Sequence, residues 1–112
     1  MYPALFTTPG VRDFAEDIDQ ERQAQLKKFG EQRHPDGTGM HYQKALADQE
    51  RRACQAAFEN GRGTWRHILH EEVYEAFAEK DPDKLRTELL QVAAVCAAWI
   101  SDIDQRPATS NP

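Results

Sequence analysis

The chain has 112 residues, of which 39% are hydrophobic and 29% are charged, and its formal net charge is −5. This length suits one domain with a modest core, the negative charge disfavours a nucleic-acid polymer or an anionic membrane as a partner, and no apolar run approaches the roughly 18 residues of a membrane span. The N-terminal segment lacks the basic and apolar regions of a signal peptide. Cys54 and Cys96 lie inside helical patterns, as buried reduced thiols do. We therefore expect a cytoplasmic protein with no membrane partner.

Glycine and proline divide the chain into four segments with helical periodicity. The expected helices cover residues 11–29, 41–59, 64–80 and 82–103. Gly30 follows the first helix as a typical C-terminal glycine, Thr64 is a typical N-cap for the third, and Asp81-Pro82 opens the fourth. No segment alternates with period two, so the expected fold class is all-α, and the short connections favour antiparallel neighbours.

The same patterns predict which residues face the core. In the first helix this face carries Val11, Phe14, Ala15, Ile18 and Phe29. In the second it carries Tyr42, Ala45, Leu46, Ala53, Ala56 and Ala57. The expected organisation is an N-terminal extension over residues 1–10, a helical domain over 11–104 and a flexible polar tail over 105–112.

The sequence HEEVYEAF, residues 70–77, places a carboxylate where a core residue is expected. One face of the third helix carries Trp65, Ile68, Leu69 and Ala76. Glu72 falls in the middle of that face. Because an unpaired carboxylate is costly to ionise at a core face, its position needs an explanation.

The tight turn at Asp81-Pro82 predicts an antiparallel hairpin of the third and fourth helices, in which residues equidistant from the turn lie at the same height. Glu75 then faces Glu88, and Glu72 faces Gln91. Carboxylates gathered in this way repel one another, and a divalent cation removes the conflict. Because the donors are all oxygens, the pattern favours Mg²⁺, or Mn²⁺ in its place, over zinc.

The same acidic residues also fit a solvated helix face whose charges pair with basic neighbours. Candidates for such pairs are Arg66, Lys80, Lys84 and Arg86. His67 and His70 lie one turn apart beside the acids, but zinc would need a further convergent ligand. Spacing alone leaves the metal site and the solvated face open.

The pattern Glu71-Glu72-x-x-Glu75, followed after twelve residues by Glu88-x-x-Gln91, resembles the EExxE…ExxD signature of the MazG-like all-α nucleoside triphosphate pyrophosphohydrolases. The segments TWRHILHEEVYEAFAEKDPDKLRTELLQVAAVCAAWI and ERQAQLKKFGEQRHPDGTG are similar to the metal-binding core and the N-terminal part of small phage and actinobacterial members. The resemblance covers residues 11–104.

This resemblance implies a four-helix bundle that forms a homodimer or homotetramer, with a metal-binding hairpin of its third and fourth helices. It implies Mg²⁺-dependent cleavage of an NTP or dNTP to the monophosphate and pyrophosphate. By motif position, the implied metal ligands are Glu71, Glu72, Glu75, Glu88 and Gln91. A catalytic role in holding the attacking water falls to Glu72 or Glu75, and the sequence does not choose between them.

Gln91 departs from the family pattern, which has aspartate at this position. An amide oxygen can still bind a cation, but the loss of one negative charge lowers metal affinity and weakens the activation of water. The alternative is therefore a catalytically weak or silent MazG-like module that binds a nucleotide or a protein partner.

Five further residues are candidates for substrate contacts. Arg22 and Gln25 are polar positions in the stripe of the first helix, with Lys28 nearby, and could reach a base or the phosphates. They could equally form an ion pair or lie along the edge of the core. His34 and Asp36 belong to a turn-forming, glycine-rich segment that is either a structural loop or a place where backbone amides approach a phosphate.

Overall fold

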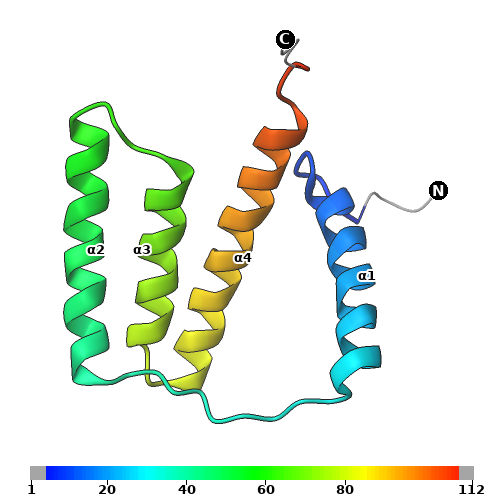
Figure 1. Cartoon of the computed structure of the whole chain (residues 1–112), viewed down its shortest axis with the longest axis horizontal. Helices are drawn as coiled ribbons and strands as arrows, with labels where there is room; N and C mark the ends of the chain where they lie inside the picture. Colours follow the sequence, from blue (N-terminus) through cyan, green and yellow to red (C-terminus); the bar gives the residue numbers. More distant parts are fainter. Residues whose placement is uncertain (1–4, 109–112) are drawn as a thin grey trace. The chain divides into compact units, whose positions relative to one another are not determined.

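The computed structural model describes residues 5–108, and over this range the chain forms four α-helices and no β-strand. The helices are α1 (Val11–Phe29), α2 (His41–Glu59), α3 (Trp65–Ala78) and α4 (Pro82–Asp104) (Figure 1). The all-α class expected from the sequence is confirmed. The outer parts of the expected extension and tail, residues 1–4 and 109–112, lie outside the described range. None of the described helices is long and apolar enough to cross a membrane.

The chain divides into two compact units. The first, here called the α2–α3 unit, consists of Pro35–Cys96 and contains α2, α3 and the first part of α4. The second, the α1 unit, consists of the described residues up to His34 together with those from Ala97 onward. The complete acidic motif lies within the α2–α3 unit.

Local capping explains where α3 and α4 begin. The Thr64 hydroxyl accepts a hydrogen bond from the His67 N–H at 3.3 Å, and the His67 ring accepts one from the Thr64 N–H at 3.2 Å, which together form a capping box. Asp81 accepts a hydrogen bond from the Asp83 N–H at 2.9 Å, and Pro82 occupies the first position of α4. Because three residues, 79–81, join α3 to α4, both halves of the acidic motif stay close together.

Small side chains form the contact between α2 and α3. The buried residues of this unit are Gln43, Ala47 and Cys54 of α2, Ala76 of α3 and Leu85 of α4. Alanine and cysteine project little from the backbone, so the helices can approach closely, and no large side chain in the described part is fully buried. The stripe expected for α2 is mostly wrong. Only Leu46 and Ala57 are half-buried, whereas the exposed members are Tyr42, Ala45, Ala53 and Ala56. The buried face runs instead through Ala47 and Cys54.

The segment 35–40 closes the C-terminal end of α3. The Gly39 N–H donates a hydrogen bond to the Phe77 carbonyl at 2.9 Å, and the Thr38 hydroxyl donates one to the Glu79 carbonyl at 2.6 Å. Carbonyl groups at the end of a helix have no partner within the helix. The glycine-rich segment thus supplies hydrogen-bond donors to carbonyl groups at the end of α3 that have no donor within the helix. This is a structural role.

Gln43 fixes this segment from the start of α2. Its side-chain nitrogen donates a hydrogen bond to the Gly37 carbonyl at 3.0 Å, and its side-chain oxygen accepts one from the Met40 N–H at 2.7 Å. Both ends of this buried amide are therefore satisfied. The contact explains why a polar residue occupies a buried position of α2.

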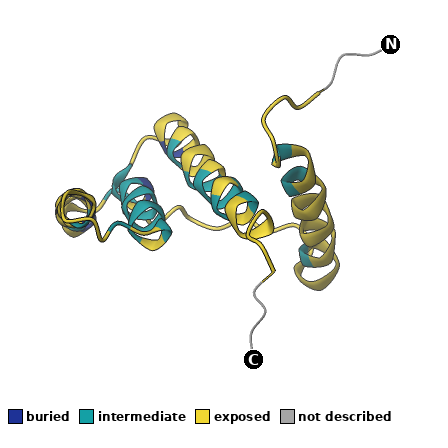
Figure 2. Ribbon diagram, turned by 90° about the horizontal axis from the view of Figure 1, so that it is seen from above, coloured by how far each residue is buried: buried dark blue, intermediate teal, exposed yellow. Residues whose placement is uncertain are grey.

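α1 has no buried residue (Figure 2). Val11, Phe14 and Ala15 are half-buried, as their place in the expected stripe predicts. The expectation is wrong further along the helix, where Ile18 is 43% and Phe29 is 57% exposed. Beyond α1, the α1 unit contains only short segments and the end of α4, so it offers little surface to cover the whole stripe.

Candidate metal centre

Three carboxylates from two helices converge in the α2–α3 unit. One oxygen from each of Glu72, Glu75 and Glu88 lies within 4.8 Å of the other two. Glu72 and Glu75 lie one turn apart on α3, whereas Glu88 lies on α4. All three residues are half-buried. We call these residues the glutamate group.

Burial and mutual repulsion disfavour the ionised form of two members of the glutamate group, Glu72 and Glu75. Burial, which disfavours the charged form, is the largest cause that raises the pKa of Glu72 and of Glu75 above the ordinary value. Negative charge adds to this effect, because Glu75, Glu88 and Glu71 act on Glu72 while Glu71 and Glu88 act on Glu75. Arg51 opposes the rise in the pKa of Glu75. A cation at this position would relieve the remaining repulsion.

Gln91 of α4 lies against two members of the glutamate group. Turned with its NH₂ group towards them, its amide donates hydrogen bonds to Glu72 Oε2 at 3.3 Å and to Glu88 Oε2 at 3.1 Å. Turned the other way, it presents its carbonyl oxygen to the same place, since the two ends of the amide have nearly the same shape. Gln91 can therefore offset carboxylate repulsion in one orientation and offer a metal ligand in the other.

Glu71 lies next to this group and interacts with α2. Its carboxylate accepts a hydrogen bond from the buried Cys54 thiol. Burial, this hydrogen bond and the charges of Glu71 and Glu72 raise the pKa of Cys54 to about 11, so the thiol stays protonated at neutral pH. Glu71 does not belong to the close set of three carboxylates, and its role as a ligand stays a prediction.

The sequence patterns did not predict that a residue of α2, Arg51, contacts the glutamate group. Arg51 Nε lies 3.5 Å from Glu75 Oε1, and Arg51 Nη1 lies 3.0 Å from Asp48 Oδ1. The signal was present, because Ala47 and Cys54 mark the face turned towards α3 and Arg51 lies between them. A stripe placed on the larger apolar side chains of α2 concealed this face.

His70 of α3 pairs with Glu50 of α2, outside the glutamate group. His70 Nδ1 lies 2.9 Å from Glu50 Oε2, and the His70 ring meets the Tyr74 ring edge-on at a centroid distance of 4.8 Å. His67 is used in the cap of α3. These contacts give both histidines structural partners and favour neither as a zinc ligand.

A cavity of about 310 Å³ lies beside the glutamate group. Its lining consists of Ala47, Arg51, Glu75, Ala78, Glu79 and Glu88. Two members of the glutamate group thus face an open space that also meets a guanidinium. A ligand in this cavity would touch α2, α3 and α4.

The predicted substrate residues of α1 lie in the α1 unit. Arg22 Nη1 donates a hydrogen bond to Gln25 Oε1 at 2.5 Å. Gln25 and Lys28 line a surface cavity of about 410 Å³ with Phe29, whose ring centre lies 5.2 Å from Lys28 Nζ. The helix itself brings these residues together, and their use for a substrate stays a prediction.

The two predicted residues of the glycine-rich segment fall on either side of the division between the units. His34 is exposed at the end of one part of the α1 unit, with its Nε2 3.5 Å from Gln32 Nε2. Asp36 is exposed in the α2–α3 unit, just before the residues that cap α3. Substrate contact by either residue also stays a prediction.

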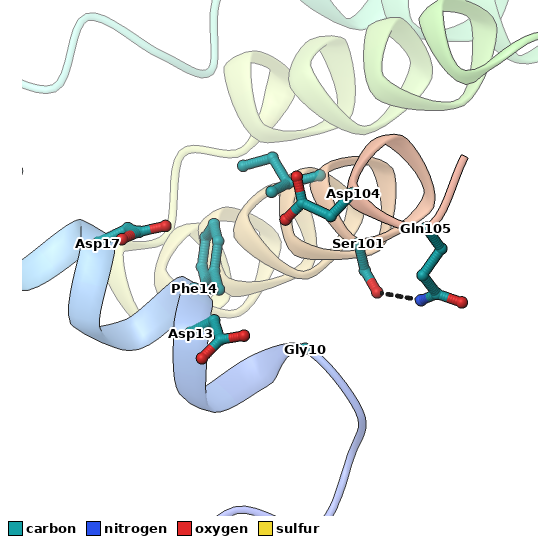
Figure 3. A pocket seen from close by; sticks show the side chains of 8 residues that line it. Gly10, Asp13, Phe14, Asp17, Ser101, Asp104 and Gln105 are labelled. Carbon is teal, nitrogen blue, oxygen red and sulfur yellow. Dashed lines mark hydrogen bonds between the residues drawn. The ribbon is translucent and has the colours of Figure 1, made fainter. Parts of the chain in front are cut away.

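Another acidic cavity, of about 220 Å³, lies within the α1 unit (Figure 3). Asp13 and Asp17 of α1 and Asp104 of α4 line it, and a hydrogen bond of 2.8 Å joins Gln105 Nε2 to Ser101 Oγ at its edge. Over the described range, only the glutamate group brings three such side chains close enough to hold one ion. The candidate metal centre is therefore the glutamate group and not this aspartate cavity.

Comparison with protein-family models, with curated proteins and with solved structures finds no match.

Proposed function

We propose that this protein is a metal-dependent nucleotide pyrophosphohydrolase that cleaves an NTP or dNTP to the monophosphate and pyrophosphate. The observation that carries the proposal is the convergence of Glu72, Glu75 and Glu88 from two helices, with oxygens within 4.8 Å of one another. The proposal includes a MazG-like bundle in which α3 and α4 form an antiparallel metal-binding hairpin. The spacing of the acidic motif supports this part of the proposal.

The donor set fits Mg²⁺ or Mn²⁺. Mg²⁺ binds oxygens at about 2.1 Å, so ligands at opposite corners of its octahedron lie about 4.2 Å apart. The glutamate oxygens lie within 4.8 Å of one another, so small side-chain rotations would bring them to a common ion. The carbonyl of Gln91 is a further oxygen at the same place. Burial is the main cause of the raised pKa values of Glu72 and Glu75, and such an ion would remove the carboxylate repulsion that adds to it.

Bound Mg²⁺ supplies charge neutralisation and Lewis acidity for phosphoryl transfer. Glu72 and Glu75 of α3, together with Glu88 and Gln91 of α4, would hold the ion. A carboxylate can accept a proton from a water that it holds, and Glu72 and Glu75 are the candidates for this role. The half-buried setting of the glutamate group limits competing bulk water.

The test is pyrophosphate release from a panel of NTPs and dNTPs in the presence of Mg²⁺ or Mn²⁺. Wild type, Glu72→Ala and Glu59→Gln are compared, because Glu59 is an exposed carboxylate at the end of α2. We expect release by wild type and Glu59→Gln and none by Glu72→Ala. Absence of release from every nucleotide, with folded protein and metal present, would contradict the proposed activity.

A silent module that binds a nucleotide or a protein partner is the second candidate. Gln91 favours it, because its NH₂ group can hydrogen-bond Glu72 and Glu88 and thereby lower their repulsion without any ion. This candidate predicts nucleotide or partner binding with no pyrophosphate release. A plain helical module with solvated acids would instead show no stabilisation by Mg²⁺ or Mn²⁺ beyond that of ionic strength.

A homodimer or homotetramer is also part of the proposal. The large apolar side chains Ile18, Leu26 and Phe29 of α1 are exposed, and a second copy could cover them. Light scattering coupled to size-exclusion chromatography measures the assembly directly. A monomer at high protein concentration would contradict this part and leave the proposed chemistry open to its own test.

A further inference from the structure

Arg51 joins the glutamate group to the cavity beside it. Its guanidinium lies 3.5 Å from Glu75 Oε1 through Nε and 3.0 Å from Asp48 Oδ1 through Nη1. The Glu75 side chain is 24% exposed and that of Arg51 is 44% exposed, so the guanidinium sits between a half-buried acid and open space. Arg51 is held on one side by its own helix and on the other by a predicted metal ligand.

The metal-free cavity has a net negative charge, which disfavours the binding of a phosphate compound. Arg51 lines it together with three acids, Glu75, Glu79 and Glu88. An anion entering this space meets a negative balance, which a divalent cation on the glutamate group would cancel. A guanidinium offers paired N–H donors in a plane, which suits phosphate oxygens better than any other side chain.

Arg51 and a bound cation would compete for the negative charge of the Glu75 carboxylate. Once the charge of the carboxylate is shared with a cation, the 3.5 Å contact weakens, while the 3.0 Å contact with Asp48 keeps Arg51 in place. The donors on the Nε side of the guanidinium then lie at the cavity without a strong acceptor. Loading of the cation would thus remove the negative balance of the cavity and leave the open donor that a phosphate group needs.

We propose that Arg51 is the phosphate-binding residue of this site, held by Glu75 in the metal-free protein and turned to a phosphate of the nucleotide once a divalent cation engages Glu75. This inference rests on the proposed function, because it requires a cation on the glutamate group. It names a residue of α2 outside the acidic motif and sets an order, in which the cation binds before the phosphate compound.

The inference predicts opposite effects on two ligands. Removal of the guanidinium removes a competitor for Glu75 and leaves Mn²⁺ affinity unchanged or higher, whereas it weakens the binding of a phosphate compound to the loaded protein. A purely structural ion pair predicts instead that both affinities fall together. Arg52 provides the matched control, since it is the next residue of α2, is exposed and loses the same charge.

The experiment compares wild type, Arg51→Gln, Arg51→Lys and Arg52→Gln by calorimetry, first with Mn²⁺ and then with the Mn²⁺ complex of inorganic pyrophosphate. We expect Arg51→Gln to bind pyrophosphate about tenfold or more weakly, as loss of a charge-assisted hydrogen bond predicts. Arg51→Lys keeps the charge without the planar donors and falls in between, and Arg52→Gln matches wild type. Circular dichroism confirms that each variant is helical.

Pyrophosphate affinity equal to wild type in a folded Arg51→Gln overturns the inference, and so does an equal loss of Mn²⁺ and pyrophosphate affinity. If that variant does not fold, the Arg51 Nε–H resonance of the wild type gives the answer. It should shift when Mg²⁺ is added and again when pyrophosphate follows. No second shift overturns the inference.

These outcomes also separate the inference from the proposed function. Pyrophosphate binding that depends on Arg51, without turnover of any nucleotide, keeps the inference and contradicts the hydrolase. Nucleotide turnover that Arg51→Gln does not change supports the hydrolase and contradicts the inference. No Mn²⁺ binding by wild type overturns both.

Discussion

Glu72 and Gln91 meet between α3 and α4, where the Gln91 amide nitrogen lies 3.3 Å from Glu72 Oε2 when its NH₂ group faces the acids. The same nitrogen lies 3.1 Å from Glu88 Oε2. A neutral amide thus holds together two carboxylates that would otherwise repel each other. A carboxylate in place of Gln91 would add to the repulsion, and only a cation could balance it.

Gln91→Asp should therefore trade stability for metal affinity. We expect the metal-free variant to unfold at a lower temperature than wild type, because it loses two hydrogen bonds and gains a charge. We expect it to bind Mn²⁺ about tenfold more tightly, because a carboxylate is a stronger ligand than an amide. Calorimetry with Mn²⁺ and assays of pyrophosphate release measure the gain, and Gln91→Asn is the neutral control. No change in affinity or activity would place Gln91 outside the site.

Divalent cations should stabilise the protein. A ligand that binds the folded state alone adds about 2.7 kcal/mol to the free energy of unfolding at a concentration of 100 Kd. We expect the melting temperature to rise with Mg²⁺ or Mn²⁺ and to stay constant in NaCl of equal ionic strength. Glu72→Ala should abolish the rise. An equal rise in that variant would show that the ions act elsewhere on this acidic chain.

The metal-free protein should become less stable as the pH rises. The pKa values of Glu72 and Glu75 are raised in the folded state, so that state holds protons more tightly than the unfolded chain. The stability that comes from this difference is present below the ordinary pKa of 4.5 and is lost as the pH rises through the raised values. Saturating Mg²⁺ should reduce this loss, because it favours the ionised carboxylates.

Urea unfolding between about pH 4 and pH 8 measures this dependence for wild type and Glu72→Gln. Other carboxylates titrate in the same range, so the difference between the two proteins is the informative quantity. We expect Glu72→Gln to gain on wild type steadily towards neutral pH in the absence of metal. Parallel curves would show that ionisation of Glu72 carries no cost in this fold.

The course of the helices could be predicted because it depends on local signals. The bounds of α1 and α2 agree with those expected, since Gly30 and Asn60-Gly61 stop a helix whatever surrounds it. The end of α3 differs by two residues. It stops at Ala78 rather than Lys80, and the carbonyl of the following Glu79 is bound by Thr38 from a distant segment, a contact that no local pattern contains.

The acidic site was predictable to the extent that it lies on two helices joined by a short connection. The spacing within α3 and the three residues of that connection place Glu72, Glu75 and Glu88 near one another. Arg51 comes from α2, and its position depends on which face of α2 meets α3. That choice follows from the small size of Ala47 and Cys54, whereas hydrophobicity points to Tyr42.

Cys54 should react slowly in the native protein. Its side chain is buried, with 7% exposed, and its pKa is raised to about 11, so little thiolate is present at neutral pH. We expect iodoacetamide to modify Cys54 only after unfolding in urea, as peptide mass spectrometry would show. Glu71→Gln removes a hydrogen bond and a charge and should speed native modification by less than about tenfold, since burial remains. Equal rates in the two proteins would contradict the contact between Glu71 and Cys54.

Gly39→Ala should destabilise the α2–α3 unit strongly. Gly39 has a φ of 85°, and a Cβ there would lie 2.5 Å from the Cβ and 2.8 Å from the Cα of Lys80, so backbone would have to move. The displaced segment would also lose the hydrogen bond from the Gly39 N–H to the Phe77 carbonyl at the end of α3. Gly61→Ala is the matched control, because Gly61 has a φ of 70° and nothing within 4 Å of a built Cβ.

Both substitutions carry the cost of a positive φ, about 1–2 kcal/mol for alanine. Only Gly39→Ala adds the overlap with Lys80, which we expect to lower the free energy of unfolding by about 1–3 kcal/mol more. Urea unfolding of the two variants measures the difference directly. Because Glu75 lies within the last turn of α3, next to its capped end, Gly39→Ala should also weaken Mn²⁺ binding, whereas Gly61→Ala should not. Equal losses of stability in both variants would show that segment 35–40 does not hold the end of α3.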